Sequence, residues 1–254
     1  MVLNEAGVDV PARTSRRGLI VVILVTCLAL AGVAWAVFGR AQPAGAPALS
    51  ASVPAPIVDE PKAGATTTET AVLAGGCFWG VQGVFEHVKG VTRAESGYTG
   101  GTTANPTYDD VTTETTGHAE SVRITYDPTQ VTYGQLLQVF FTVVQDPTQL
   151  NRQGPDEGTS YRSAIFPQDA DQQKVADAYI AQLTKAAAFP APIVTKVEPK
   201  GAFYPAEAYH QDFLNSNPSY PYIARYDMPK LNGLEQTFPA LYSEQPVLVG
   251  AGQG

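Results

Sequence analysis

The feature that most constrains this chain is an uncharged apolar run over residues 18–39. The run reaches the roughly 20 residues that a helix needs to span the hydrocarbon core of a bilayer. Arg13, Arg16 and Arg17 precede it, and only Arg40 follows closely. The positive-inside rule therefore places segment 1–17 in the cytoplasm and everything after the run outside it. We expect a single-pass membrane protein with an extracytoplasmic domain.

Two export signals are alternatives to a membrane anchor. Ala34-Trp35-Ala36 fits a small-x-small cleavage site, and residues 15–20 loosely resemble a twin-arginine signal. The length of the apolar run favours an uncleaved anchor. All three interpretations place the remainder of the chain outside the cytoplasm.

Composition divides the rest of the chain into three parts. Segment 40–66 is rich in Pro, Ala and Gly and has no aromatic residue, so it is predicted to be an extended linker that cannot order itself. A single compact domain is predicted over 67–239, followed by a C-terminal tail over 240–254.

The pattern of the domain indicates alternating strands and helices. Strands are expected near 70–74, 91–97, 121–126, 161–166 and 193–197, and helices over 78–88, after Thr132 and over 169–188. Thr132 can cap its helix, whose apolar stripe is Tyr133, Leu136, Leu137, Phe140, Phe141 and Val144. This order predicts an α/β (α+β) two-layer sandwich with a ferredoxin-like plait core. Beyond Phe203 a long irregular C-terminal segment is expected.

Charge and cysteine content exclude several classes of function. The net charge of −8, with no cluster of Lys and Arg, argues against nucleic-acid binding. Two cysteines, Cys27 and Cys77, exclude a disulfide framework. The three histidines are scattered and no zinc-ligand spacing occurs, so no metal site is predicted.

Cys77 occupies a distinctive place in the predicted fold. Gly75 and Gly76 end a buried strand, and a helix is expected to begin at Phe78. A lone cysteine is more often a small buried hydrophobe. At the first turn of a helix, however, free N–H groups and the helix dipole stabilise a thiolate. We therefore predict a poised nucleophile that iodoacetamide alkylates rapidly well below about pH 8.5, the reference thiol pKa.

Several short segments together resemble one enzyme family. Gly76-Cys77-Phe78-Trp79-Gly80 is similar to the active-site signature of peptide-methionine (S)-S-oxide reductases, the A-type methionine sulfoxide reductases. Five further blocks follow in the family's order, at 105–108, 116–120, 127–128, 158–163 and 206–211. The resemblance covers about 67–229. It implies thiol-dependent reduction of the S epimer of methionine sulfoxide, free or in proteins, and hence a role in protein repair.

The resemblance also implies roles for the reacting groups. Cys77 matches the nucleophile that attacks the sulfoxide sulfur and becomes a sulfenic acid. Glu120 matches the acid that protonates the departing oxygen, a role that needs a pKa raised by burial. Without the resemblance, Glu120 would equally be an exposed residue that opens a strand.

Further residues match the family's substrate pocket. Tyr108 and Tyr161 match the hydroxyls that bind the sulfoxide oxygen, and Asp156 matches another polar pocket residue. Phe78 and Trp79 would hold the S-methyl group. From the residues alone, Tyr108 reads as a turn residue and Tyr161 as a strand core residue.

Three departures from the family pattern limit what the resemblance implies. Thr112 stands where many members have a cysteine, so no resolving thiol lies in the domain. The sulfenic acid must then be reduced by an external thiol, either a thioredoxin-like protein or a low-molecular-weight thiol, with no bound cofactor. Gln145 replaces a usual histidine and Ser160 a common glutamine, which could alter pocket polarity or substrate preference.

We expect a monomer that repairs proteins at the cell surface.

Two other functions are consistent with the residues. A Cys/His hydrolase would pair Cys77 with His118 or His210. A tethered extracytoplasmic binding module would recognise oxidised or apolar segments without turnover.

Overall fold

The computed structural model describes residues 53–65 and 67–250. The predicted cytoplasmic segment 1–17 and the predicted membrane span 18–39 lie outside the described residues. Within the part of the chain that is described, no helix is both long and apolar enough to cross a bilayer.

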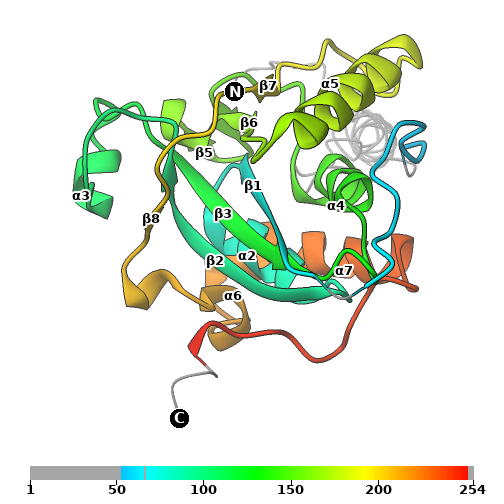
Figure 1. The fold of residues 1–254 in the computed structure, drawn as a ribbon. Helices are drawn as coiled ribbons and strands as arrows, with labels where there is room; N and C mark the ends of the chain where they lie inside the picture. The colour runs from blue at the N-terminus through cyan, green and yellow to red at the C-terminus, as the bar shows by residue number, and fades with distance from the viewer. Residues whose placement is uncertain (1–52, 66, 251–254) are drawn as a thin grey trace, which may run out of the picture. The chain divides into compact units, whose positions relative to one another are not determined.

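A six-stranded sheet organises the fold (Figure 1). Its order is β7-β6-β1-β3-β2-β8, where the strands are β1 (Glu69–Gly75), β2 (Val91–Thr99), β3 (Ala119–Tyr126), β6 (Ser163–Ile165), β7 (Lys196–Val197) and β8 (Tyr204–Pro205). The central strands β6, β1, β3 and β2 pair antiparallel throughout. This is the strand order and direction of the predicted ferredoxin-like plait.

The principal helices bury one face of this sheet. They are α2 (Phe78–Glu86), α4 (Tyr133–Val139), which continues as a π-helix over Phe140–Val144, and α5 (Ala170–Lys185). Residues of all three share one hydrophobic core with β1, β2 and β3. The predicted apolar stripe after Thr132 is buried throughout, and Thr132 forms a capping box with Gln135. Both predictions are confirmed.

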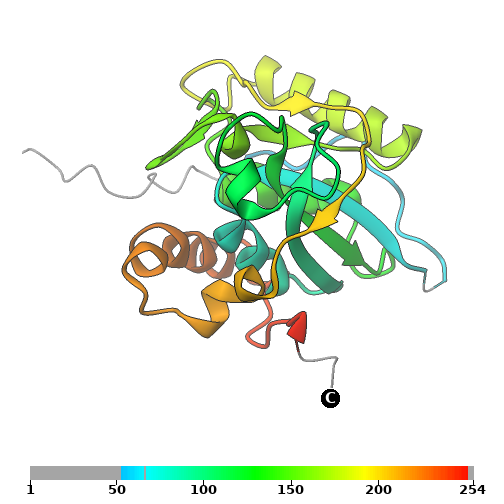
Figure 2. The same cartoon turned by 90° about the vertical axis from the view of Figure 1, so that its left-hand side faces the viewer.

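Shorter elements complete the domain. They are α3 (Tyr108–Val111), the hairpin of β4 (Arg152–Gln153) and β5 (Asp156–Glu157), 3-10 turns at Thr159–Tyr161 and Ala208–His210, α6 (Phe213–Ser216), a π-helix at Ile223–Asp227 and α7 (Met228–Thr237). Figure 2 shows α2 between the sheet and the orange C-terminal helices, in agreement with the contacts of α2 with α6 and α7.

The prediction of an irregular segment after Phe203 was therefore wrong in part. Pro229 stands in the first turn of α7, where proline's missing N–H costs no hydrogen bond. Leu231 and Leu234 lie three positions apart and are buried, so this helix has an apolar face that packs on the domain.

Residues 53–65 of the predicted linker are docked on the domain. Val53 is 2% exposed and belongs to the main core. Asp59 accepts hydrogen bonds from Gly134 N at 2.8 Å and from Thr132 Oγ1 at 2.5 Å, at the start of α4. Proline content predicted an extended spacer, but the burial of Val53 and the hydrogen bonds of Asp59 help to hold the described part of the segment on the domain.

This docking predicts a stability difference between two fragments. A fragment that begins at residue 67 should lose about 3 kcal/mol of unfolding free energy relative to one that begins at residue 51, from the burial of Val53 and the bonds of Asp59. Urea denaturation measures the difference. Val53→Ala in the longer fragment should reproduce part of it, whereas Ile57→Ala, at a side chain that is 85% exposed, should change little. Equal midpoints for both fragments would contradict the docking.

The described part of the predicted tail also packs against the domain. The backbone of 241–247 bonds to residues at the end of α2 and just after it, including Lys89 N to Leu241 O at 2.7 Å. Asp212 accepts from Val249 N at 2.9 Å and from Gly250 N at 3.0 Å. Residues 240–250 therefore form an ordered cover over the C-terminal end of α2.

Candidate active site

Cys77 is the N-cap residue of α2, as the sequence predicted. Gly76 before it has φ +91°, and a Cβ there would lie 2.5 Å from Gln153 Cβ, so this turn requires glycine. Cys77 itself is half-buried and lines a cavity of about 540 Å³. Cys77 thus borders a cavity that is large enough for a small ligand.

Glu120 lies beside the same turn. It is the second residue of β3, is 2% exposed, and its Oε2 accepts a hydrogen bond from Phe78 N at 2.9 Å. Burial raises the pKa of Glu120 to about 8, against this backbone bond, and the nearby carboxylates of Asp156, Glu114 and Asp227 add to the rise. The raised pKa that an acid role requires is therefore present, and Glu120 is largely protonated at neutral pH.

The pKa of the Cys77 thiol moves in the opposite direction to the one predicted. Burial raises it well above its ordinary value, and the carboxylates of Glu120 and Asp227 raise it further, whereas a backbone hydrogen bond from Trp79 lowers it. The helix N-terminus favours the thiolate. The loss of solvation and the neighbouring negative charges nevertheless raise the pKa of the thiol by more than the helix terminus lowers it. The prediction of a thiolate in the resting protein was wrong, and at neutral pH both Cys77 and Glu120 hold their protons.

Alkylation tests this protonation state. The rate of iodoacetamide reaction at Cys77 should be slow near neutral pH and rise only above about pH 8.5, because the thiolate is the nucleophile. Glu120→Gln, which removes the neighbouring carboxylate, should move the rise to lower pH. Rapid, pH-independent alkylation near about pH 7 would show that the helix terminus prevails after all.

The two candidate tyrosines share their surroundings with the two reacting groups. Tyr108 opens α3, and burial raises its pKa to about 12, with the charges of Glu120 and Cys77 adding. The pKa of Tyr161 is raised by burial and then by Glu120, Tyr108 and Cys77. Both hydroxyls therefore remain protonated hydrogen-bond donors near Cys77 and Glu120. Tyr161 ends a 3-10 turn and not a strand, so the strand prediction was wrong there.

Ser160 and Glu114 hold that turn. Glu114 accepts from Ser160 N at 2.9 Å and from Ser160 Oγ at 2.5 Å, and also from Thr159 Oγ1 at 2.8 Å. Ser160, one of the departures from the family pattern, thereby fixes the backbone directly before Tyr161.

Trp79 and Phe78 differ in exposure. Trp79 is half-buried and stacks on Phe213 with ring centroids 3.9 Å apart, and its Nε1 donates to His210 Nδ1 at 3.1 Å. Phe78 is 1% exposed and packs against Tyr98 and His210. Phe78 can therefore form only the floor of a substrate pocket, whereas Trp79 can form a wall.

The fifth candidate, Asp156, lies in β5 and lines the Cys77 cavity. It accepts a hydrogen bond from Tyr222 Oη. Burial raises its pKa, while that hydrogen bond and the charge of Lys230 lower it. Asp156 thus connects the reacting groups to the C-terminal elements.

Those C-terminal elements bring three residues that the sequence analysis missed: Tyr222, Asp227 and Lys230. Asp227 is fully buried and pairs with Lys230 Nζ at 3.0 Å. A Cβ on Gly80 would collide with the Asp227 carboxylate, so this carboxylate rests on the first turn of α2. The i,i+3 spacing of Asp227 and Lys230 is typical of a helical ion pair, but nothing in the sequence indicated that it lies near Cys77.

Neither histidine forms a dyad with Cys77. His118 accepts from Gly101 N through Nδ1 at 3.1 Å, and its Nε2 lies 2.7 Å from Thr103 O. His210 is neutral, because burial lowers its pKa, and its Nδ1 accepts from Trp79. In both rings the nitrogen that carries the lone pair therefore already accepts a hydrogen bond. Neither histidine is free to act as the base that a Cys/His hydrolase needs.

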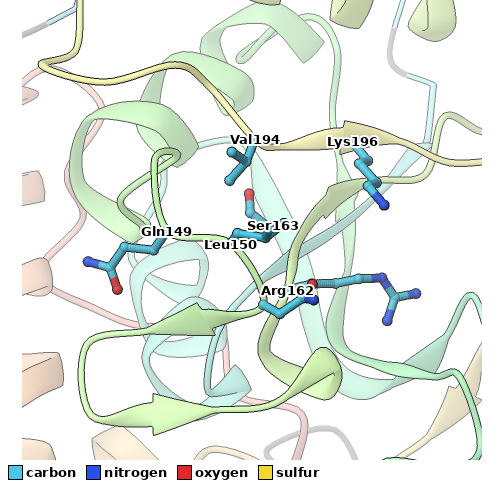
Figure 3. A pocket seen from close by; sticks show the side chains of 7 residues that line it. Gln149, Leu150, Arg162, Ser163, Val194 and Lys196 are labelled. Carbon is cyan, nitrogen blue, oxygen red and sulfur yellow. The ribbon is translucent and has the colours of Figure 1, made fainter.

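A second depression lies beside β6 and β7 (Figure 3). It is bordered by Gln149, Leu150, Asn151, Arg162, Ser163, Val194 and Lys196 and has no enclosed volume. Arg162 is paired with Glu198 at 2.9 Å. Ser163 Oγ lies 2.8 Å from Thr195 Oγ1, so two polar side chains of this depression already have partners.

Comparison with known proteins agrees with this geometry. Residues 69–240 match the family model described as peptide methionine sulfoxide reductase. A relative from Mesorhizobium japonicum, peptide methionine sulfoxide reductase MsrA 2, is 64% identical over 182 residues, which is 72% of this chain and 93% of the relative. A protein of the same name from Synechocystis sp. is 51% identical over 188 residues, 73% of this chain and 88% of the relative.

Two solved structures share the fold. Methionine sulfoxide reductase A of Corynebacterium diphtheriae is 34% identical with a TM-score of 0.53, over 67% of this chain and 90% of that one. Mxr1 from Saccharomyces cerevisiae in reduced form is 32% identical with a TM-score of 0.54, over 63% of this chain and 91% of that one.

Fold and site together define a cysteine-dependent oxidoreductase on a mixed α/β scaffold, with a protonated carboxyl beside its thiol. The chain belongs to the peptide methionine sulfoxide reductase family. It is a peptide-methionine (S)-S-oxide reductase, which reduces methionine sulfoxide at the expense of thiols.

Proposed function

We propose that Cys77 attacks the sulfoxide sulfur and that Glu120 protonates the sulfoxide oxygen. The observation that carries this proposal is the buried Glu120 carboxyl, whose pKa is raised to about 8 and which is bonded to the same helix turn as Cys77. A carboxyl that keeps its proton at neutral pH can donate it to an oxygen that must leave its sulfur.

The step balances without any added acid or base. Cys77 Sγ bonds to the sulfoxide sulfur while Glu120 gives its proton to the oxygen. Transfer of that oxygen to Sγ then breaks the sulfur–oxygen bond, releasing methionine and leaving a sulfenic acid on Cys77. The thiol proton of Cys77 returns to Glu120. Because Cys77 and Glu120 both begin protonated, the site needs no other proton donor or acceptor for one turnover.

The neighbouring side chains supply binding and orientation. Tyr108 and Tyr161 donate hydrogen bonds to the sulfoxide oxygen, which stabilises the charge that develops there. Trp79 forms the wall and Phe78 the floor of the pocket for the S-methyl group, and Asp156 accepts from a polar group of the substrate.

An external thiol restores the enzyme. The chain has two cysteines, and Cys27 lies in the apolar run, so no second thiol of the domain can form a disulfide with Cys77. One thiol condenses with the sulfenic acid, releasing water and leaving a mixed disulfide. A second thiol then releases Cys77 as a disulfide forms between the two reductant molecules. A thioredoxin-like protein and a low-molecular-weight thiol both satisfy this chemistry.

We further propose that the enzyme is a monomer held at the membrane by residues 18–39, with its catalytic domain outside the cytoplasm. The uncharged run and the arginines before it support this location. A tethered domain on that side suits repair of oxidised methionine in cell-surface proteins.

The activity is tested with racemic methionine sulfoxide and dithiothreitol, followed by chiral chromatography of the remaining substrate. We expect only the S epimer to be consumed, with one dithiothreitol oxidised for each methionine formed. Consumption of both epimers at equal rates would show that the pocket does not select by configuration, and survival of both would refute the activity.

A further inference from the structure

Residues 53–65 form a strap along one side of the domain, beside α4 in Figure 1. Several of its hydrogen bonds to the domain use uncharged groups. These are Gln138 Nε2 to Val53 O at 2.9 Å, Tyr179 Oη to Pro54 O at 2.8 Å, Gln182 Nε2 to Ala55 O at 2.8 Å, Ile57 N to Gln182 Oε1 at 2.8 Å and Ala63 N to Pro128 O at 3.2 Å. Such bonds do not change between acid and neutral pH. The ionisable residues of the strap are Asp59, Glu60 and Lys62.

Glu60 docks among other carboxyl groups. They are those of Glu69, which opens β1, Asp169, which caps α5, and Asp59, its neighbour in the strap. Gln172 Nε2, in the first turn of α5, donates to Thr70 O at 2.9 Å and holds the start of α5 beside the start of β1. Four carboxyl groups from three segments of the chain therefore converge where the strap meets the domain.

No cation balances these four carboxyls. Within residues 53–65 and 67–250, none of them forms an ion pair with Lys, Arg or His. Lys62, the cation of the strap, donates to Gln130 O at 2.9 Å instead. Like charges at this separation repel, so ionisation of the whole cluster disfavours docking.

The other ionisable groups near Glu60 are two phenols. Tyr126 Oη of β3 donates to Glu69 Oε2 at 2.7 Å, and Tyr133 of α4 is fully buried. Burial raises the pKa of both hydroxyls, and the charge of Glu60 adds to the rise. Both phenols therefore stay neutral, and neither offsets the charge of Glu60.

The proton on Glu60 is coupled to docking. Burial, followed by the charges of Glu69, Asp169 and Asp59, raises the pKa of Glu60 from 4.5 to about 7, and a hydrogen bond with the Glu69 carboxyl adds to the rise. In an undocked strap, water surrounds Glu60 and restores the ordinary pKa. The docked form thus binds a proton that the undocked form has lost. Docking is strongest below about pH 4.5 and weakens as the pH rises to about 7.

We propose that segment 53–65 is a pH-sensitive strap, held on the domain while Glu60 shares a proton with Glu69 and loosened when that proton passes to water. The device is separate from the chemistry of Cys77. In the membrane tether proposed above, release of the strap lengthens the connection to the membrane by up to about 45 Å, at roughly 3.5 Å for each residue. The domain then reaches farther at neutral pH than in acid.

Hydrogen–deuterium exchange of the full chain in detergent micelles tests the strap. Mass spectrometry follows peptides from 53–65, and each exchange rate is divided by the intrinsic rate at the same pH to give a protection factor. We expect this factor to fall about tenfold between about pH 5 and about pH 8, with solvent screening of the part-exposed carboxyl limiting the effect. Peptides from β1 and β3 report that the domain stays folded.

Glu60→Gln should keep the strap protected at both pH values, because an amide does not ionise and can still donate a hydrogen bond to Glu69. Glu69→Gln should make the fall smaller, since it removes the neighbouring charge. Glu235→Gln makes the same change at an exposed position of α7 and should behave as the unaltered chain does.

Two results would overturn the proposal. One is a protection factor of the unaltered chain that does not change with pH, and the other is a full fall that persists in Glu60→Gln. If Glu60→Gln left the strap unprotected at every pH, Glu69→Gln would decide, because a full fall in that variant would exclude the shared proton and a smaller one would support it.

Discussion

Cys77→Ser is expected to abolish methionine sulfoxide reduction, lowering turnover by more than about 10⁴-fold. A serine hydroxyl is a far weaker nucleophile than a thiol, and it cannot carry the oxygen as a sulfenic acid that thiols then reduce. Methionine formed in the presence of dithiothreitol measures the effect.

Cys27→Ser is the matched control, because Cys27 is the chain's other cysteine. It should retain full activity with dithiothreitol. If Cys77→Ser kept some turnover, and that turnover disappeared only when Cys27 was also replaced, Cys27 would be a second nucleophile, which would contradict the assignment of the reaction to Cys77 alone.

Glu120→Gln is expected to lower kcat/KM about 10²- to 10⁴-fold, the usual contribution of a general acid. The amide has the shape of the carboxyl group and can still accept a hydrogen bond from Phe78 N. The loss of kcat/KM therefore measures the absence of the proton donor and not a structural change in the turn. Because the pKa of Glu120 is raised to about 8, the protonated, active form dominates below that pH. Activity of the unaltered enzyme should fall as the pH rises through about 8.

The same alkaline fall should be absent from the residual activity of Glu120→Gln. Glu235→Gln, at an exposed position of α7, should leave both the rate and the pH profile unchanged. A Glu120→Gln variant with near-normal kcat/KM would mean that another group, or water, protonates the oxygen.

The strand, glycine turn and helix around Cys77 could be predicted from the sequence because each depends on local pattern. Buried apolar residues, then Gly75 and Gly76, then a helical period, leave few alternatives for the backbone. Thr132 and its apolar stripe were predictable for the same reason. The pocket residues came from resemblance to a family, since neither Tyr108 nor Tyr161 carries a local signal of function.

Other features depend on contacts between distant segments and could not be read locally. Glu120 is 42 positions from Phe78, its hydrogen-bond donor. The burial of Cys77 itself, followed by the charges of Glu120 and Asp227, raises the thiol pKa that the helix terminus alone would lower. Asp227 reaches the first turn of α2 from an element that looked irregular. Val53 and Asp59 order a proline-rich stretch through contacts with a helix that lies far along the chain.

A single turnover without reductant tests whether Cys77 itself takes the oxygen from the sulfoxide. The enzyme is mixed with excess S-epimer methionine sulfoxide and no thiol, the methionine released is counted, and peptide mass spectrometry locates any modification. We predict one methionine for each chain and one added oxygen on Cys77, as a sulfenic acid that dimedone traps. Release of methionine with Cys77 unmodified, or no release until a thiol is added, would contradict it.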